Sequence, residues 1–186
     1  MQVGSYSITP FSIQGPLLIS PKILGDSRGF FTERFKTKEF QEIGLPVFVQ
    51  ENYSRSQSRV LRGLHYQFDR PQGKCVTATR GKIFDVAVDI RASSPTFGQH
   101  LTVILDGAKP EWFWVPAGFA HGFCVISDEG ADVEYKVDTL YNPAGEGAIQ
   151  WNDSELKIEW PITEPSLSAK DQVTSSFAKY KMEPKF

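Results

Sequence analysis

The stretch Val60-Leu-Arg-Gly-Leu-His-Tyr-Gln67 decides how the rest of this chain is interpreted. It has the composition of a buried strand, yet it places an arginine, a histidine and a tyrosine within a few positions of one another. Strict alternation sends His65 to one face of a sheet and Arg62 to the other. If both side chains face one pocket, Gly63 or its neighbours must break the regular strand. The histidine is either an accident of packing or the reason for this strand.

The segments on both sides of this stretch are mostly short strands. After a short helix expected at 37–44, where Gly44 would end it, apolar and β-branched runs follow one another, separated by turn signals such as Asn142-Pro143. Many short strands without intervening helices predict an all-β antiparallel barrel or sandwich rather than a doubly wound fold. The tail 163–186 is more polar and is expected to be peripheral, with Ser168 as the cap of a C-terminal helix.

Length and composition predict a single domain, residues 1–186, that binds neither nucleic acid nor a membrane. The chain is 40% hydrophobic and 23% charged and has a net charge of −2, which does not favour a nucleic-acid partner. No stretch approaches the roughly 20 apolar residues of a membrane helix, and the start lacks the pattern of a signal peptide. Cys75 and Cys124 both lie in apolar runs, which indicates reduced core cysteines and a cytoplasmic location.

His121 lies in a second distinctive segment, Trp114-Val-Pro-Ala-Gly-Phe-Ala-His121, where a tight turn would deliver a histidine to the start of a strand. This Pro-x-Gly-x-x-His form is similar to the second half of the metal-binding pattern of cupins, which are small antiparallel β-barrels. The first half of that pattern supplies a His-x-His pair, but here Gln67 replaces the second histidine. A lone histidine beside a glutamine is a poor ligand set for a catalytic transition metal, so we expect no metal.

Acid–base chemistry at His65 is the remaining interpretation. A histidine base needs a carboxylate that orients its far nitrogen and a site that stabilises charge on the substrate. An isolated histidine is more often a core residue bonded to backbone, and His100 fits that description because its strand has no polar companion. His65 fits it less well, since Arg62 is near in sequence and Lys74 follows the next turn.

Six segments, in the expected order, resemble the dTDP-4-dehydrorhamnose 3,5-epimerase family. They are VLRGLHYQ, QGK at 72–74, GKIFDVAVDIRASSPTFG, WVPAGFAHGF, EYKVDTLY and LSAKD, and the matches run from about Asp26 to Asp171. The resemblance implies a cupin-type antiparallel β-barrel or jelly roll with short helices, usually as a homodimer. It also implies action on dTDP-4-dehydro-6-deoxyglucose without metal or cofactor. The ketone at C4 of that sugar acidifies the protons on C3 and C5, so epimerisation needs a base, an opposed acid and an electrophile.

The same resemblance implies a role for each candidate residue. His65 would be the base, and Asp171 the carboxylate that orients it. Tyr135 would be the acid across the sugar ring, which suits a group with an ordinary pKa near 10, and Lys74 would stabilise the enolate oxygen. The residues implied to bind the substrate are Arg28, Glu33, Gln50, Asn52, Arg62, His121, Glu146 and Lys170.

Other interpretations of these residues stay open. Without the resemblance, Tyr135 would be an inward barrel aromatic, and Lys74, Glu146 and Lys170 would be surface charges. A member of the family could invert one carbon only or isomerise a related keto-sugar. A cupin that only binds a nucleotide sugar is disfavoured by the combination of base, orienter, acid and cation. A metal-dependent cupin oxygenase or isomerase is disfavoured by Gln67.

The N-terminal strands expected in residues 1–27 are the candidate dimer contact. The extended apolar run up to Leu24 offers strand edges that need covering, and a symmetric dimer would cover them. Arg28 and Glu33 follow this run, so they are the residues to examine for a crossing into a neighbour's site.

Overall fold

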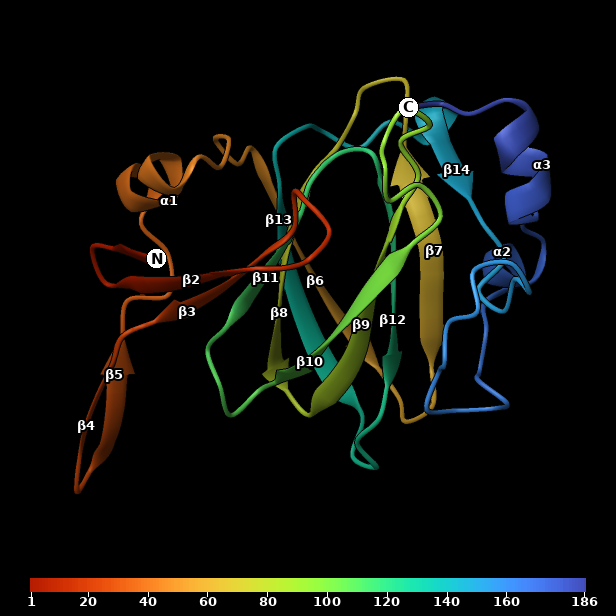
Figure 1. Cartoon of the computed structure of the whole chain (residues 1–186). Helices are drawn as coiled ribbons and strands as arrows, with labels where there is room; N and C mark the ends of the chain where they lie inside the picture. The colour runs from red at the N-terminus through yellow and green to blue at the C-terminus, as the bar shows by residue number, and fades with distance from the viewer.

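A computed structural model describes all 186 residues, and it consists of two antiparallel sheets that enclose a common interior, with a separate hairpin at one side (Figure 1). In order across the larger sheet, the seven strands are β1 (Gln2–Val3), β2 (Tyr6–Pro10), β3 (Leu17–Pro21), β11 (Trp112–Val115), β8 (Lys74–Arg80), β13 (Ala131–Val137) and β6 (Gln50–Ser56). The five-stranded sheet has the order β10 (His100–Asp106), β9 (Lys82–Asp89), β12 (Phe119–Val125), β7 (Leu61–Gln67) and β14 (Glu146–Ala148). Strands β4 (Ile23–Asp26) and β5 (Gly29–Thr32) form the hairpin. The predicted all-β antiparallel architecture is confirmed.

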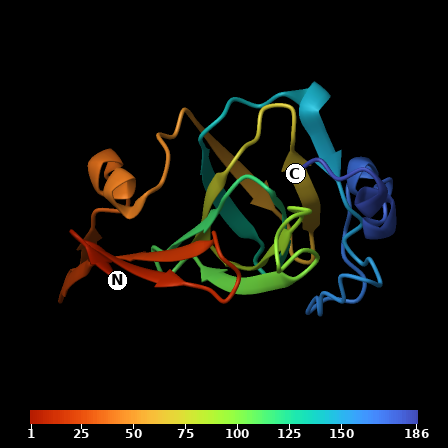
Figure 2. The same cartoon turned by 45° about the horizontal axis from the view of Figure 1, so that its top comes forward.

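The helices are short: α1 (Thr37–Ile43), the 3-10 turn η1 (Pro143–Gly145), α2 (Ala169–Gln172) and α3 (Phe177–Met182). None of them has the length and apolar character that crossing a bilayer requires. The helix predicted at 37–44 is confirmed, and it ends at Gly44, whose φ of 98° is left-handed and suits glycine. Figure 2 shows α1 and the N-terminal strands on one side of the barrel, and α2 and α3 on the opposite side.

The C-terminal helix expected after Ser168 is instead two helices. Ser168 caps α2 and Ser176 caps α3, and each serine hydroxyl accepts a backbone N–H. The intervening residues include β-branched Val173 and Thr174, which are weak helix formers. The backbone N–H of Ser175 donates to the carbonyl of Ala148, the last residue of β14, so pairing with the sheet edge overrides helix continuation.

The hydrophobic core and the polar interior lie along the same strands. Every second residue of β8 points inward: Ala78 and Val76 lie in the main core cluster, Val76 also lines a polar cavity, and Lys74 lies in that cavity. The inward-pointing side chains of β8 therefore contribute to the apolar core at one end of the strand and to the candidate site at the other. Cys75 and Cys124 are both buried and unpaired, as predicted for core cysteines.

Strands β7 and β12 pair irregularly between Arg62 and His65, where the alternation of side chains predicts a break in the strand. His65 lies opposite His121 and Arg62 opposite Phe123, so three steps on β7 match two on β12. Gly63 lies within this shift with a φ of 137°, and a Cβ there would sit 2.5 Å from a Cα of β12. The expected break at Gly63 is confirmed, and it allows the side chains of Arg62 and His65 to line the same cavity.

Candidate active site

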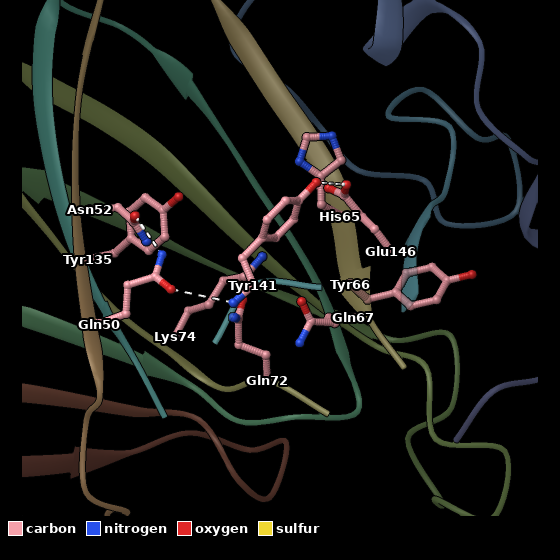
Figure 3. A pocket seen from close by; sticks show the side chains of 10 residues that line it. All are labelled: Gln50, Asn52, His65, Tyr66, Gln67, Gln72, Lys74, Tyr135, Tyr141 and Glu146. Carbon is pink, nitrogen blue, oxygen red and sulfur yellow. Dashed lines mark hydrogen bonds between the residues drawn. The ribbon is translucent and has the colours of Figure 1, made fainter. Parts of the chain in front are cut away.

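A polar cavity opens between the two sheets and has two adjoining lobes of about 290 and 280 Å³. Both lobes are lined by His65, Lys74, Tyr135 and Glu146. In Figure 3, His65 and Glu146 lie on one side of the first lobe and Gln50, Asn52 and Tyr135 on the other. The second lobe adds Arg62, His121, Ser168, Lys170 and Asp171.

The cavity therefore brings together the four residues predicted to be catalytic and six of the eight predicted to bind the substrate. Those six are Gln50, Asn52, Arg62, His121, Glu146 and Lys170. Arg28 and Glu33 do not line it within one chain. Their predicted role depends on a partner, and it stays a prediction.

His65 and Asp171 form a hydrogen-bonded pair at the cavity wall. Nε2 of His65 lies 2.7 Å from Oδ1 of Asp171, which is delivered by α2. Burial opposes ionisation of this carboxyl, but hydrogen bonds from His65 and Ser168 outweigh burial and lower the pKa of Asp171 to about 2. An anionic Asp171 accepts a hydrogen bond from Nε2–H, so Nδ1 is the ring nitrogen that keeps a free lone pair.

Lys74 extends from the start of β8 into both lobes. Burial lowers the pKa of its ammonium to about 8, although the negative charges of Glu146 and Asp85 oppose that shift. A desolvated, compact cation at this place suits an oxygen on which negative charge develops during a reaction.

Tyr135 faces His65 from the other sheet. It belongs to β13 of the seven-stranded sheet, whereas His65 belongs to β7 of the five-stranded sheet. Burial raises the pKa of Tyr135, with the nearby Arg62 opposing the shift, so the phenol stays protonated at neutral pH. The imidazole of His65 and the phenol of Tyr135 therefore approach the cavity from different sheets.

Glu146 joins two other side chains at the mouth of the cavity. Its Oε2 accepts hydrogen bonds from the Tyr141 hydroxyl at 2.7 Å and the Lys170 ammonium at 2.5 Å (Figure 3 shows the tyrosine bond). Despite partial burial, these two partners lower the pKa of Glu146. Tyr141 is not among the residues predicted from the sequence. It is the last residue of the EYKVDTLY segment, and its place in that segment is the sequence feature that could have indicated it.

A second histidine–carboxylate pair consists of His121, which lines the second lobe, and Asp85, which does not line it. Nε2 of His121 is 2.8 Å from Oδ1 of Asp85, and both side chains are buried. Burial raises the pKa of Asp85, while His121 opposes the shift. Sequence reasoning also missed Asp85, because only the register of β9 against β12 shows that it reaches His121.

Gln67, which replaces a metal ligand of the cupin pattern, fixes a loop. Its amide donates to the carbonyl oxygens of Arg70 at 2.5 Å and Leu140 at 3.3 Å, and its oxygen accepts the N–H of Asn142 at 2.8 Å. All three hydrogen bonds of the Gln67 side chain are therefore made with backbone groups. The side chains of the chain form no group of three or more His, Cys, Asp or Glu arranged to hold a metal ion.

The hairpin β4–β5 projects away from the barrel (Figure 1). Arg28 lies at its turn with a side chain that is 88% exposed, and Phe30 and Phe31 are also exposed. Glu33 follows the hairpin and forms an ion pair with Lys36. These apolar and charged side chains therefore have no cover within one chain.

The family model for dTDP-4-dehydrorhamnose 3,5-epimerase matches residues 10–179. The chain belongs to this family. It is 50% identical over 173 residues to the dTDP-4-dehydrorhamnose 3,5-epimerase of Pseudomonas aeruginosa, covering 91% of this chain and 95% of that protein. It is also 40% identical over 168 residues to a dTDP-4-dehydrorhamnose 3-epimerase of Streptomyces niveus, covering 89% of this chain and 81% of that protein.

Solved structures of 3,5-epimerases have the same fold. The dTDP-6-deoxy-D-glucose-3,5-epimerase of Legionella pneumophila, solved with dTDP-4-keto-L-rhamnose, superposes with a TM-score of 0.88 at 48% identity over 92% of each chain. The dTDP-4-dehydrorhamnose 3,5-epimerase of Bacillus anthracis, solved with TDP and pyrophosphate, gives 0.88 at 39% identity, covering 92% of this chain and 99% of that one. The family and the fold implied by the sequence motifs are therefore confirmed.

Proposed function

We propose that the cavity epimerises dTDP-4-dehydro-6-deoxyglucose at C3 and C5, with His65 as the base. The activity follows from the family: the chain is a dTDP-4-dehydrorhamnose 3,5-epimerase, and its 3,5-epimerase relatives are about half identical over most of its length. The observation that carries the proposed mechanism is the His65–Asp171 pair, which faces a desolvated lysine and, from the other sheet, a protonated tyrosine.

Proton removal begins at a carbon beside the C4 ketone. Nδ1 of His65 takes the proton from C3 or C5, and the C–H electron pair moves toward the ketone to form an enolate. The ammonium of Lys74 stabilises the enolate oxygen, and anionic Asp171 stabilises the imidazolium that forms. Lys74 and Asp171 each stabilise a charge that develops only during the reaction, which is the condition for acceleration.

Proton return comes from the opposite side of the sugar ring. Tyr135 donates its phenolic proton to the carbon that His65 deprotonated, and the enolate becomes a ketone again with inverted configuration. Exchange with solvent then restores the protonated tyrosine and the neutral histidine, and the cycle can repeat at the second carbon. The separation of base and acid onto two sheets supports inversion rather than return of the proton to the same face.

The substrate's diphosphate is proposed to lie near Arg62 and Lys170. Nε of Arg62 donates to the Ser56 hydroxyl at 3.0 Å, which fixes the guanidinium and leaves its terminal nitrogens for phosphate oxygens. Gln50 and Asn52, which are hydrogen-bonded to each other at 2.9 Å, supply further polar contacts from β6. His121 and Glu146 complete the polar lining on the sugar side.

A homodimer is part of this proposal. The hairpin β4–β5 exposes four large apolar side chains: Ile23, Leu24, Phe30 and Phe31. Strand β6 lies at an open edge of the seven-stranded sheet, beside the cavity. A hairpin that covers a partner's sheet edge would bring Arg28 and Glu33 toward that partner's substrate. A cytoplasmic location, supported by the two unpaired buried cysteines, is also part of the proposal.

A mono-epimerase is the alternative that the experiment must exclude, because a 3-epimerase of Streptomyces niveus is also a relative, although at 40% identity it is less similar than the 3,5-epimerases at about 50%. Incubation with dTDP-4-dehydro-6-deoxyglucose in deuterated water, followed by NMR, separates the candidates. We expect deuterium at both C3 and C5. Deuterium at one carbon only would make the chain a mono-epimerase, and no deuterium at either carbon would contradict proton-transfer catalysis. A stoichiometric metal that activity requires would contradict the proposed mechanism.

A further inference from the structure

Ser168 makes two hydrogen bonds with Asp171, the carboxylate that orients His65. Its hydroxyl accepts the backbone N–H of Asp171 at 3.2 Å and donates to the Oδ2 atom of the same residue at 2.5 Å. The other carboxylate oxygen, Oδ1, bonds Nε2 of His65 at 2.7 Å and accepts the backbone N–H of Gly63 at 3.3 Å. Both oxygens of Asp171 are therefore held.

The direction of these bonds fixes where the protons lie. The backbone N–H of Asp171 can only donate, so the Ser168 hydroxyl uses an oxygen lone pair to accept it, and its own proton points at Oδ2. A carboxylate that already accepts a hydrogen bond from Ser168 on Oδ2 presents Oδ1 as an acceptor for Nε2–H of His65. The sequence of bonds from Ser168 through Asp171 to His65 thus selects the tautomer whose Nδ1 is free.

We propose that Ser168 is a positioning residue of the proton-transfer site, whose hydroxyl holds the Asp171 carboxylate in the orientation that keeps the proton on Nε2 of His65 and leaves Nδ1 for the substrate. This inference rests on the proposed function of His65 as the base. It gives the serine of the LSAKD segment a task beyond capping, since a cap needs only the lone pair of the hydroxyl and this serine also uses the proton.

The chain contains an internal comparison for the capping role. Ser176 caps α3 in the same way, and its hydroxyl accepts the backbone N–H of Lys179 at 3.2 Å, but it has no carboxylate partner. Removing the Ser176 hydroxyl takes away a helix cap alone. Removing the Ser168 hydroxyl takes away a helix cap and the donor to Asp171.

The pair is surrounded by groups that both substitutions leave in place. The charged and titratable side chains that share the cavity with His65 and Asp171 are Arg62 on β7, Lys74 on β8, His121 on β12, Tyr135 on β13, Glu146 on β14 and Lys170 on α2. Because none of these side chains changes in a serine variant, a change in the pH dependence of the variant's activity reports the bond that Ser168 makes with Asp171. Loss of that bond leaves more negative charge on Oδ1, which strengthens the interaction of the carboxylate with an imidazolium.

The experiment compares the full-length wild-type protein with the variants Ser168→Ala, Ser168→Thr and Ser176→Ala. We expect Ser168→Ala to lower kcat about 10- to 100-fold with little change in KM, the effect of losing one hydrogen bond to a charged group. We also expect the acid limb of its kcat/KM profile to move to higher pH. Threonine keeps the hydroxyl and should restore both properties, while Ser176→Ala should resemble the wild type.

Three outcomes overturn the inference: a Ser168→Ala protein with the kcat and pH profile of Ser176→Ala, an acid limb that stays or moves to lower pH, or a threonine variant no better than the alanine one. A wild-type protein that shows no exchange of substrate protons contradicts the proposed function instead. The two failures are therefore distinguishable.

Discussion

The Nε2 atom of His65 lies 2.7 Å from the Oδ1 atom of Asp171, although 106 positions separate the two residues in the chain. The histidine belongs to β7 in the barrel wall, and the aspartate belongs to the C-terminal segment that runs along the outside of it. The contact makes the tail part of the site. Substitutions in the tail should therefore affect catalysis as well as stability.

Asp171→Asn should keep the shape of the side chain but reverse the orientation that it imposes on His65. An amide nitrogen facing the ring would donate to Nε2 and favour the tautomer that carries its proton on Nδ1. The nitrogen that faces the substrate would then have no lone pair with which to accept a proton. We expect kcat/KM to fall by about 10⁴-fold, the loss caused by the same change in a Ser-His-Asp triad. Steady-state kinetics measures this effect, and an unchanged circular dichroism spectrum shows that the fold is retained.

The same residue should make stability depend on acidity. The pKa of Asp171 is lowered from its ordinary value of 3.8 to about 2 in the fold, so the ionised carboxylate stabilises the native state above about pH 4. This contribution, roughly 2 kcal/mol, is lost as the pH falls toward 2. Urea unfolding of wild type and Asp171→Asn at several pH values should show the difference in free energy of unfolding shrinking across that window. A difference that is constant with pH would contradict the assignment.

Lys74 should set an alkaline limb in the activity. Its pKa of about 8 means that the ammonium, and with it the stabilisation of the enolate, is lost as the pH rises through that value. The kcat/KM profile reports groups of the free enzyme and should fall with a midpoint near 8. Lys74→Arg keeps a charge that does not titrate in this range, so its lower activity should stay flat to higher pH. An identical limb in that variant would assign the limb to another group.

Gly63→Ala should destabilise the fold because a Cβ would sit 2.5 Å from the Cα of Gly122. Gly29→Ala is the matched control, since Gly29 has a similar φ of 134° but no atom within 4 Å of the added carbon. The backbone strain of about 1–2 kcal/mol is common to both variants, and a clash adds about 1–3 kcal/mol only at Gly63. Thermal unfolding should therefore show a larger fall in Tm for Gly63→Ala, and equal falls would contradict the close approach of β7 and β12.

The exposed phenylalanines of the hairpin should control assembly. Phe31→Asp places a charge on a surface that the proposal buries, and it should shift the protein from dimer to monomer in analytical ultracentrifugation. Leu140→Asp, at another side chain that is exposed, serves as a control and should leave the oligomeric state unchanged. If Phe31→Asp leaves a dimer intact, or the wild type is a monomer, the proposed role of the hairpin is wrong.

The sequence predicts the fold class and part of the site for identifiable physical reasons. Turn-separated β-branched runs indicate antiparallel strands, and the opposite parity of Arg62 and His65 requires the break observed at Gly63. Asp85 was not predicted, because its contact with His121 depends on the register between β9 and β12. The split of the C-terminal helix was missed for a similar reason, since a backbone bond from Ser175 to the sheet edge is tertiary.

The central claim is that His65 removes the protons at both carbons. The most direct measurement is the exchange of substrate H3 and H5 in deuterated water, followed by NMR, for His65→Gln beside wild type and His100→Gln, whose histidine lies outside the cavity. We predict that His65→Gln slows exchange at both carbons by at least about 10²-fold, as loss of a general base does, while His100→Gln exchanges both at the wild-type rate. Near-normal exchange at either carbon in His65→Gln would contradict the assignment of the base.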